Sequence, residues 1–136
     1  MIFVDTSVWI HFFNGVHNPY TQTLNVVLGE RRVVSGDLVL TELLQGFRND
    51  EEFRTVRAYM QLFPCEPMVG QQAAVEAAQA FRTLRRRGLT IRKTIDVLIA
   101  MHCIRNDYSL LHQDRDFSLM APALGLRELH VPNDRQ

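Results

Sequence analysis

The amino-acid sequence opens with a short apolar run, residues 2–4, that ends in Asp5 and passes directly into a helical pattern of apolar residues. Further short apolar runs at 32–35 and 109–112 each precede a segment with helical spacing. Parallel strands are buried on both faces, so they read as short continuous apolar runs joined by helical crossovers. The alternation predicts an α/β domain with a mainly parallel central sheet of four to five strands flanked by helices.

The positions of the individual elements follow from apolar periodicity. Helical spacing is found at residues 8–13, 20–28, 37–47, 50–62, 71–87, 95–106 and 117–123. A short extended piece is expected around Cys65, and a last strand at 127–131. Thr6 or Ser7 is placed to cap the first helix, and Thr94 to cap the helix that follows it.

Length and composition bound the class of protein. At 136 residues, with 46% hydrophobic and 22% charged residues, the chain has the composition of a globular protein. We expect a single domain over 1–132 and a short frayed tail over 133–136. No apolar run reaches the roughly 18–20 residues that span a bilayer. No basic segment precedes the first apolar stretch, so a cytoplasmic protein is expected.

Cysteine and histidine are too dispersed for a zinc site. Cys65 and Cys103 lie far apart among apolar neighbours, which favours two buried thiols over a disulfide framework. The five histidines form no closely spaced ligand pair, so a zinc enzyme is disfavoured.

The charged residues balance in number but not in position. Fifteen basic and fifteen acidic residues cancel, yet no acid occurs between Glu76 and Asp96. This stretch contains Arg82, Arg85, Arg86, Arg87, Arg92 and Lys93, the last being the chain's single lysine. Two interpretations remain open: a solvated helix face, or a surface whose guanidinium groups bind phosphate.

Acidic residues recur where the predicted strands end. Asp5 follows the first strand, Asp114 and Asp116 follow the run at 109–112, and Glu42 and Asp96 lie on helices after other turns. Each has a structural explanation on its own, such as a cap, a polar loop or a favourable helix-dipole position. In an open parallel sheet, however, ligands bind beyond the carboxyl ends of the strands.

Convergence of these acids would require a counter-charge. Two unit charges about 4 Å apart repel by roughly 4 kcal/mol at an effective dielectric near 20. Carboxylate and water ligands suit Mg²⁺ or Mn²⁺ better than zinc. Such a metal could bind a scissile phosphate and lower the pKa of an attacking water.

Four sequence blocks resemble a known family. They are residues 4–10, 40–46, 95–100 and 110–117, which read VDTSVWI, LTELLQG, IDVLIA and LLHQDRDF. In this order they closely resemble a bacterial PIN domain and, more narrowly, the toxin half of a VapBC toxin–antitoxin pair. The resemblance covers essentially the whole chain and implies a PIN-like three-layer sandwich.

The resemblance also implies a site and an activity. Asp5, Glu42, Asp96 and Asp114 take the places of the family's metal-binding acids, with Asp116 as an additional acid beside them. Thr6 or Ser7 matches a hydroxyl that supports the first aspartate or a water on the metal. The implied activity is Mg²⁺- or Mn²⁺-dependent hydrolysis of RNA, leaving a 5′-phosphate, in the bacterial cytoplasm.

The implied partners are a second copy of the chain and a small VapB-type antitoxin whose carboxyl-terminal segment blocks the acidic pocket. RNA phosphates are further expected to contact Arg85, Arg86, Arg87 and Arg92. One departure concerns His112 and Gln113, where relatives often carry a threonine and another small polar residue. It leaves open whether position 112 supports the acids.

Two other classes of protein would need a residue that this chain lacks in the required place. A phosphatase of the haloacid-dehalogenase type would need an acid where Ser7 stands, and a receiver domain would need a lysine after a late strand, where Lys93 is not. The alternative that stays open is a non-catalytic PIN-like module that binds RNA or a partner.

Overall fold

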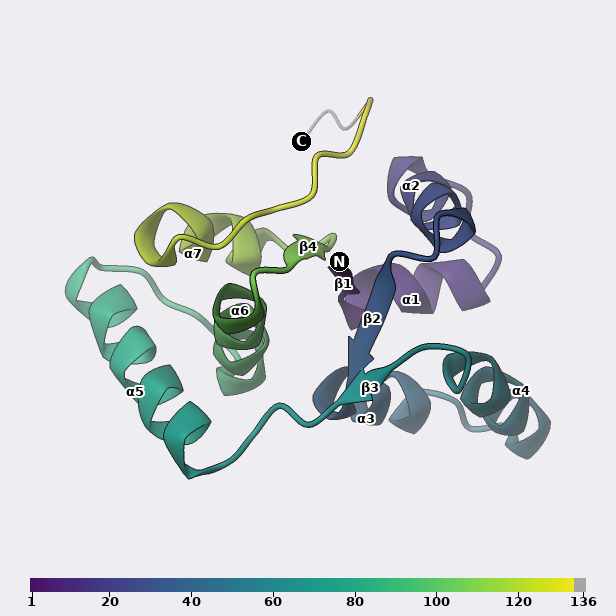
Figure 1. The fold of residues 1–136 in the computed structure, drawn as a ribbon, viewed down its shortest axis with the longest axis horizontal. Coiled ribbons are helices and arrows are strands. Elements are labelled where there is room, and N and C mark those ends of the chain that lie inside the picture. Colours follow the sequence, from purple (N-terminus) through teal and green to yellow (C-terminus); the bar gives the residue numbers. More distant parts are fainter. Residues whose placement is uncertain (134–136) are drawn as a thin grey trace.

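The computed structural model describes residues 1–133, which form a parallel sheet between two groups of helices (Figure 1). The strand order is β3 (Cys65–Glu66), β2 (Val33–Gly36), β1 (Ile2–Val4) and β4 (Ser109–Leu111). Every neighbouring pair is parallel, and Phe3 in β1 lies opposite Val34 on one side and Leu110 on the other. The predicted α/β fold with a parallel central sheet is confirmed.

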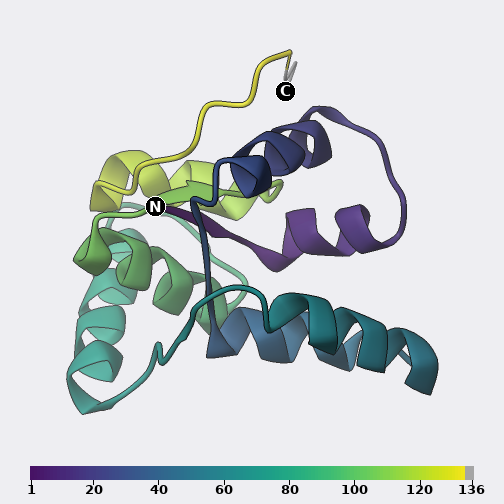
Figure 2. The ribbon, with the colours of Figure 1, turned by 45° about the vertical axis from the view of Figure 1, so that its right-hand side comes forward.

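Seven helices connect and cover these strands. They are α1 (Thr6–Phe13), α2 (Pro19–Gly29), α3 (Asp37–Gln45), α4 (Asp50–Met60), α5 (Gln71–Arg86), α6 (Thr94–Asn106) and α7 (Arg115–Leu124). Helices α1 to α4 belong to the crossovers from β1 to β2 and from β2 to β3, and they gather on one side of the sheet (Figures 1 and 2). Helices α5 to α7 lie on the other side. After β3 at one edge of the sheet, the chain returns past β2 and β1 to form β4 at the opposite edge, and this return places its connecting helices on the opposite face.

The core fills the space between the sheet and both helical groups. Phe3 of β1, Trp9 of α1 and Phe117 of α7 are among the largest fully buried side chains. Burial on both faces explains why β1 is apolar throughout and why β2 begins with two valines. Among residues 1–133, no helix is both long and apolar enough to cross a membrane.

The predicted strand at 127–131 is wrong. This segment makes a single parallel bridge, between Leu110 and Glu128, supported by hydrogen bonds from Leu110 N to Arg127 O and from Leu129 N to Leu110 O. It therefore runs beside β4 for one residue and then leaves the sheet. Of the tail expected at 133–136, positions 134–136 lie outside the described residues.

Three local predictions are also wrong. Asp5, not Thr6 or Ser7, is the N-cap of α1, because its carboxylate accepts the Ser7 backbone N–H. Helix α6 begins at Thr94 itself and has no side-chain cap. Cys103 is buried as expected, but Cys65 is exposed because its two-residue strand forms the edge of the sheet.

Candidate active site

Asp5 stands at the carboxyl end of the central strand and is held there from three directions. Its backbone N–H donates to Leu111 O at 2.9 Å, which extends the pairing of β1 with β4. Its Oδ2 accepts the Ser7 backbone N–H at 3.0 Å and the Ser7 hydroxyl at 2.7 Å. The residue is only 5% exposed, and this burial raises the pKa of its carboxyl despite the Ser7 hydrogen bonds, which lower it.

The Ser7 hydroxyl also connects Asp5 to the loop after β4. Ser7 Oγ donates to Asp5 and accepts the Gln113 backbone N–H at 2.9 Å. On the other side of α1, Thr6 Oγ1 donates to Glu42 Oε1 at 3.2 Å. The two hydroxyls in the Asp5-Thr6-Ser7 block thus orient two different acids.

Asp96 is the most buried of the candidate acids. It lies in the first turn of α6, is 1% exposed, and its Oδ2 is buried without a hydrogen-bond partner. Burial raises the pKa of Asp96 to about 7; nearby Lys93 lowers it, whereas Asp5, Asp114 and Glu42 raise it. The pKa of Glu42, on α3, is raised by burial and then by the charge of Asp5.

Asp114 completes a cluster contributed by four parts of the chain. It is the N-cap of α7, where its Oδ1 accepts the Asp116 backbone N–H at 2.9 Å. Its charge raises the pKa of Asp5, Glu42 and Asp96 alike. We call Asp5, Glu42, Asp96 and Asp114 the acid cluster, because the charge of Asp114 acts on the other three, and the charge of Asp5 acts on Glu42 and Asp96.

Asp116 belongs to the rim of this cluster. It is 5% exposed, and its Oδ2 faces Arg92, with the guanidinium Nε at 3.3 Å and the backbone N at 3.5 Å. Arg92 also brings its Nη2 to 4.0 Å from Asp114 Oδ1. Arg92 therefore separates from the other predicted RNA-binding arginines and lies against the acids.

Lys93 supplies a second cation to the acid cluster. Its Nζ lies 3.7 Å from Asp96 Oδ1 and 4.0 Å from Glu42 Oε2. Burial lowers the pKa of Lys93, but the charges of the four acids in the cluster, Asp96 first, together raise it by more. The spacing of Lys93 three residues before Asp96 is visible in the sequence, whereas its approach to Glu42 depends on how the fold brings α3 to the start of α6.

The cluster presents only oxygen donors and carries more negative charge than its two basic neighbours neutralise. Within residues 1–133, no three carboxylate, imidazole or thiol side chains converge closely enough to enclose a metal ion. The unpartnered Oδ2 of Asp96 and the raised pKa values of three acids nevertheless describe a site short of positive charge. Hard divalent cations match this donor set.

A scan against protein-family models decides the family. The model described as PIN domain matches residues 2–121, which include every member of the acid cluster. The chain belongs to the PIN domain family. In this PIN domain, Asp5 directly follows β1, and Asp114 lies in the loop after β4. Asp96 and Asp116 lie in the first turns of α6 and α7. For Asp5, Asp96 and Asp114, these are the places that the sequence pattern predicted.

Relatives and solved structures agree with this membership. The PIN domain is 28% identical over 129 residues to "Ribonuclease VapC11" of Mycobacterium tuberculosis, covering 93% of this chain and 96% of the relative. Its fold is similar to VapBC2 of Rickettsia felis bound to a promoter DNA fragment, with a TM-score of 0.74, 18% identity, and 95% and 98% coverage of the two chains. It is likewise similar to FitAcB of Neisseria gonorrhoeae, with a TM-score of 0.73, 18% identity, and 96% and 97% coverage.

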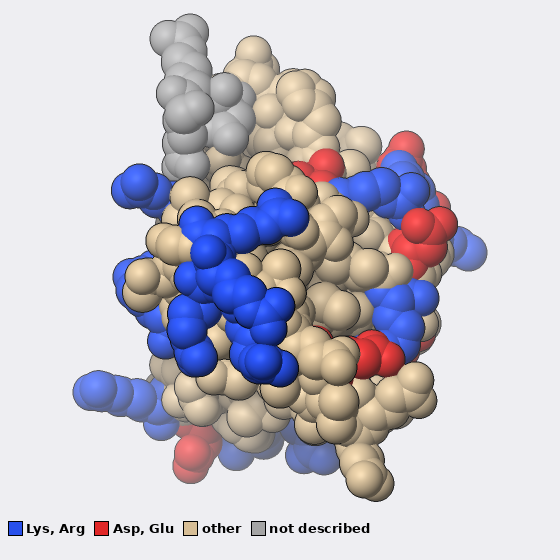
Figure 3. Space-filling model, turned by 90° about the vertical axis from the view of Figure 1, so that its left-hand side faces the viewer, with Lys and Arg blue, Asp and Glu red and all other residues tan. Residues whose placement is uncertain are grey.

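The other three arginines predicted to contact RNA lie on α5 and not beside the acid cluster. Arg85, Arg86 and Arg87 lie at the carboxyl end of α5, where Arg85 also packs over the Phe81 ring. Figure 3 shows a group of basic side chains on the face to which α5 contributes, with few acids beside it. The structure therefore splits the predicted RNA-binding set into the α5 arginines and Arg92.

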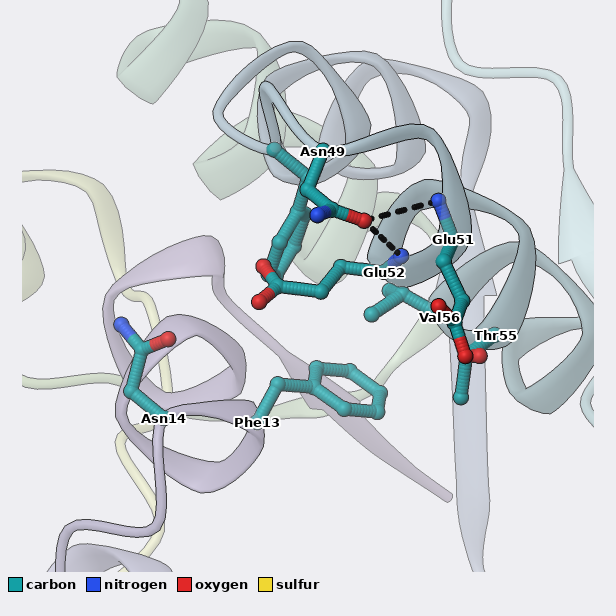
Figure 4. Close-up of a pocket in the computed structure, with 8 residues that line it drawn as sticks. Phe13, Asn14, Asn49, Glu51, Glu52, Thr55 and Val56 are labelled. Atoms are coloured by element: carbon teal, nitrogen blue, oxygen red, sulfur yellow. Dashed lines mark hydrogen bonds between the residues drawn. The ribbon is translucent and has the colours of Figure 1, made fainter.

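Of two pockets in the structure, one lies apart from the site and the other adjoins it. One, of about 430 Å³, lies between the end of α1 and the start of α4, where Asn49 Oδ1 accepts the Glu51 and Glu52 backbone N–H groups (Figure 4). Its described lining contains no member of the acid cluster. The other, of about 630 Å³, includes Asp114 in its wall and so adjoins the cluster.

Proposed function

We propose that this PIN domain is an endoribonuclease that hydrolyses RNA phosphodiester bonds and acts as the toxin of a type II toxin–antitoxin pair in the bacterial cytoplasm. The observation that carries the proposal is the acid cluster, in which four carboxylates from separate elements share one buried site. Family membership and relatives that are named VapC ribonucleases support the substrate class. By inhibiting translation, such cleavage would arrest growth.

The proposed cofactor is Mg²⁺ or Mn²⁺. Asp5, Asp96 and Asp114 would hold it, with Glu42 and Asp116 contributing directly or through water. The orphaned Oδ2 of Asp96 supports this assignment, because a buried carboxylate oxygen without a partner is costly. When bound, the cation would supply positive charge at the scissile phosphate and lower the pKa of the attacking water.

The chain's own residues prepare this chemistry. Ser7 and Thr6 fix the directions of the Asp5 and Glu42 carboxylates through their hydroxyl hydrogen bonds. Arg92 orients Asp116 and leaves most of its own side chain exposed, at 72%. Lys93 is half exposed, at 51%, so its ammonium can turn from the acids toward a phosphate group that approaches from solvent.

A second candidate function is a non-catalytic module that binds RNA or a protein partner. It is favoured by one observation, namely that Lys93 and Arg92 already place positive charge beside the acids. The two functions differ in whether RNA is cut when Mg²⁺ or Mn²⁺ is supplied.

Replacement of Asp5 tests the enzymatic proposal. Asp5→Asn keeps the oxygen that caps α1 and removes the charge, so the domain should stay folded. Cleavage of total RNA in Mg²⁺ or Mn²⁺, measured by mapping 5′-phosphate ends, should fall by about 100-fold or more. Asp37→Asn is the matched control, because Asp37 also follows a strand directly but instead accepts the Met68 backbone N–H. Undiminished cleavage by folded Asp5→Asn would refute the proposed site.

The proposed partners are a VapB-type antitoxin and a second copy of this chain. Solved structures with this fold include VapBC complexes, which supports the antitoxin assignment. Co-expression with the product of a neighbouring short reading frame should yield one co-purifying complex that no longer cleaves RNA. A toxin that stays free at equimolar mixing would contradict it, and light scattering of the free chain tests the homodimer.

The arginines supply the proposed RNA contacts outside the acid cluster. Arg85, Arg86 and Arg87 share the last turn of α5, and Arg92 stands beside the acids. An RNA strand long enough to reach both groups of arginines would bind α5 through its phosphates. Another phosphodiester bond of the same strand would then lie at the acid cluster. Phosphate contacts position a nucleic acid without reading its sequence.

A further inference from the structure

A polar pocket on the far side of Asp114 has no role in the site described above. It has a volume of about 630 Å³ and lies between α2, the loop after β4, α7 and the segment that follows α7. Figure 1 shows this last segment, in yellow, running from α7 towards α2. The residues that define its chemistry are His112, Asp114, Arg115, Ser118 and Glu128.

Glu128 is the fixed acceptor in this pocket. Its Oε2 accepts hydrogen bonds from the Ser118 hydroxyl at 2.8 Å and from His112 Nε2 at 2.7 Å. Among the described residues, no hydrogen bond uses the other oxygen, Oε1, and the side chain remains 36% exposed. The carboxylate is therefore oriented by the protein while one oxygen stays open to a ligand.

His112 ties this acceptor to the acid cluster. The Asp114 backbone N–H donates to His112 Nδ1 at 3.1 Å, so Nδ1 carries no proton in this arrangement. Nε2 must then carry the ring proton that is donated to Glu128. A continuous chain of hydrogen bonds thus joins the backbone of Asp114, the His112 ring and the Glu128 carboxylate.

His112 stands where relatives often carry a threonine, and its side chain takes part in two hydrogen bonds, with the Asp114 backbone and with Glu128. The ring is buried and packs against Phe117, with 5.1 Å between the ring centroids. A shorter threonine side chain could not reach Glu128 while also bonding to the Asp114 backbone. The orientation of Glu128 in the pocket therefore depends on the histidine that this chain carries at position 112.

We infer that this pocket receives an unstacked RNA base next to the cleaved bond, and that Glu128 selects guanine there by accepting hydrogen bonds from its N–H groups. The inference rests on the proposed ribonuclease function. The volume falls within the usual 300–1,000 Å³ of small-molecule sites, and sequence-specific RNA recognition holds splayed bases on rings and polar edges. Because Asp114 belongs to both sites, a base in the pocket would lie beside the acid cluster.

The charge of the pocket distinguishes a base from a phosphate group. Glu128 and Asp114 outnumber the single guanidinium group in the lining, that of Arg115, so the carboxylates of the pocket disfavour a phosphate group. Guanine offers two adjacent donors to a carboxylate, whereas the N–H of uracil lies between two carbonyl oxygens that a carboxylate would repel. Guanine is therefore expected to be preferred over uracil by a larger factor than over the other bases.

Cleavage-site sequencing tests the inference directly. An RNA pool with a randomised single-stranded loop is cut in Mn²⁺, and the base frequencies around each cut are compared among variants. Wild type should enrich guanine at one position beside the cut, and Glu128→Gln should reduce that enrichment, measured relative to the other three bases, about tenfold or more. Glu30→Gln, a surface glutamate paired with Arg32, is the matched control and should retain the preference.

A second measurement does not depend on cleavage. The four nucleoside 5′-monophosphates are titrated without metal into isotope-labelled Asp5→Asn protein and followed by NMR. GMP should shift the signals of residues 112–118 and 128–131 at lower concentration than UMP, and Glu128→Gln should remove this difference. If Glu128→Gln does not fold, Ser118→Ala replaces it, because it releases Glu128 from one of its two hydrogen bonds.

The outcomes separate the two proposals. Cleavage with an unchanged guanine preference in folded Glu128→Gln, or no shift of the pocket signals by any nucleotide, overturns the inference and leaves the ribonuclease intact. No cleavage by wild type under any metal condition overturns the proposed function, and GMP-selective shifts at the pocket would still support base recognition there.

Discussion

The carboxylate of Asp96 combines deep burial with an incomplete set of partners. One oxygen lies 3.7 Å from Lys93 Nζ, and the other has no hydrogen bond. Burial therefore raises the pKa of Asp96 to about 7, well above the ordinary value of 3.8. A folded protein that holds this proton more tightly than its unfolded chain gains stability from it at low pH.

The sign of this effect predicts an unusual pH dependence. The stabilising contribution of the Asp96 proton is complete below about pH 4 and is lost as the pH rises through 7. In EDTA, the wild type should therefore lose stability between pH 5 and pH 8, by an amount on the order of a few kcal/mol. Asp96→Asn has no such proton and should show a flatter dependence and a higher Tm at pH 8.

Thermal unfolding from pH 5 to pH 8 measures both slopes. Asp107→Asn is the control, because Asp107 is an exposed aspartate in a left-handed conformation that asparagine also tolerates. It should keep the wild-type slope. Equal slopes for wild type and Asp96→Asn would show that the Asp96 carboxyl titrates in its ordinary range.

The turn from β2 into α3 shows how closely the elements around the site approach one another. Gly36 ends β2 and is the N-cap of α3, the helix that carries Glu42. A Cβ at this position would overlap the Sδ and Cγ atoms of Met68, a fully buried side chain, and would lie 3.1 Å from Phe3 Cζ. The missing side chain lets the segment after β3 pack against the central strand.

Gly36→Ala should therefore destabilise the domain by about 1–3 kcal/mol, since the core around Met68 must shift. Gly29→Ala is the matched control, because Gly29 lies at the end of α2 and a Cβ there would meet nothing within 4 Å. That change should be neutral or stabilise the fold by about 0.5–1 kcal/mol. Urea unfolding of the two variants measures the difference, and equal midpoints would contradict the packing described for Gly36.

Patterns local to the chain predicted the sheet and the acids, because a strand that ends in an aspartate is visible in the sequence itself. Contacts that depend on the assembled fold could not be predicted in this way. The alternation over 127–131 is typical of a strand, but only Glu128 pairs with β4 before the chain departs. The positions of Lys93 at Glu42 and of Glu128 at His112 likewise depend on tertiary packing.

Charge is distributed over this protein as two separate regions of opposite sign. The acid cluster lies at the carboxyl ends of β1 and β4, while Arg85, Arg86 and Arg87 lie at the carboxyl end of α5, an outer helix of the fold (Figure 1). Net charge is zero, so attraction to RNA at a distance must come from this separation and not from the total.

Neutralising the α5 arginines should weaken RNA binding and reduce its dependence on salt. For a triple variant with Arg85, Arg86 and Arg87 each changed to Gln, the slope of log K against log[salt] should fall by about two to three units. The control is the same change at three other arginines, namely Arg31 between α2 and β2, and Arg54 and Arg57 on α4. Fluorescence anisotropy with labelled RNA between 50 and 300 mM salt gives both slopes. The measurement is made in the Asp5→Asn background, so that the RNA is not cut. An unchanged slope in the triple variant would identify these arginines as a solvated face.

The central place of β1 has a consequence for how the protein is made. β1 pairs with β4, so Asp5 from the start of the chain meets Asp114 only when the last quarter has emerged from the ribosome. At about 5–20 residues per second, the intervening segment takes roughly 5 to 20 seconds to synthesise. A nascent or truncated chain therefore carries no complete acid cluster, and a ribosome translating this message is not exposed to the activity of the unfinished product.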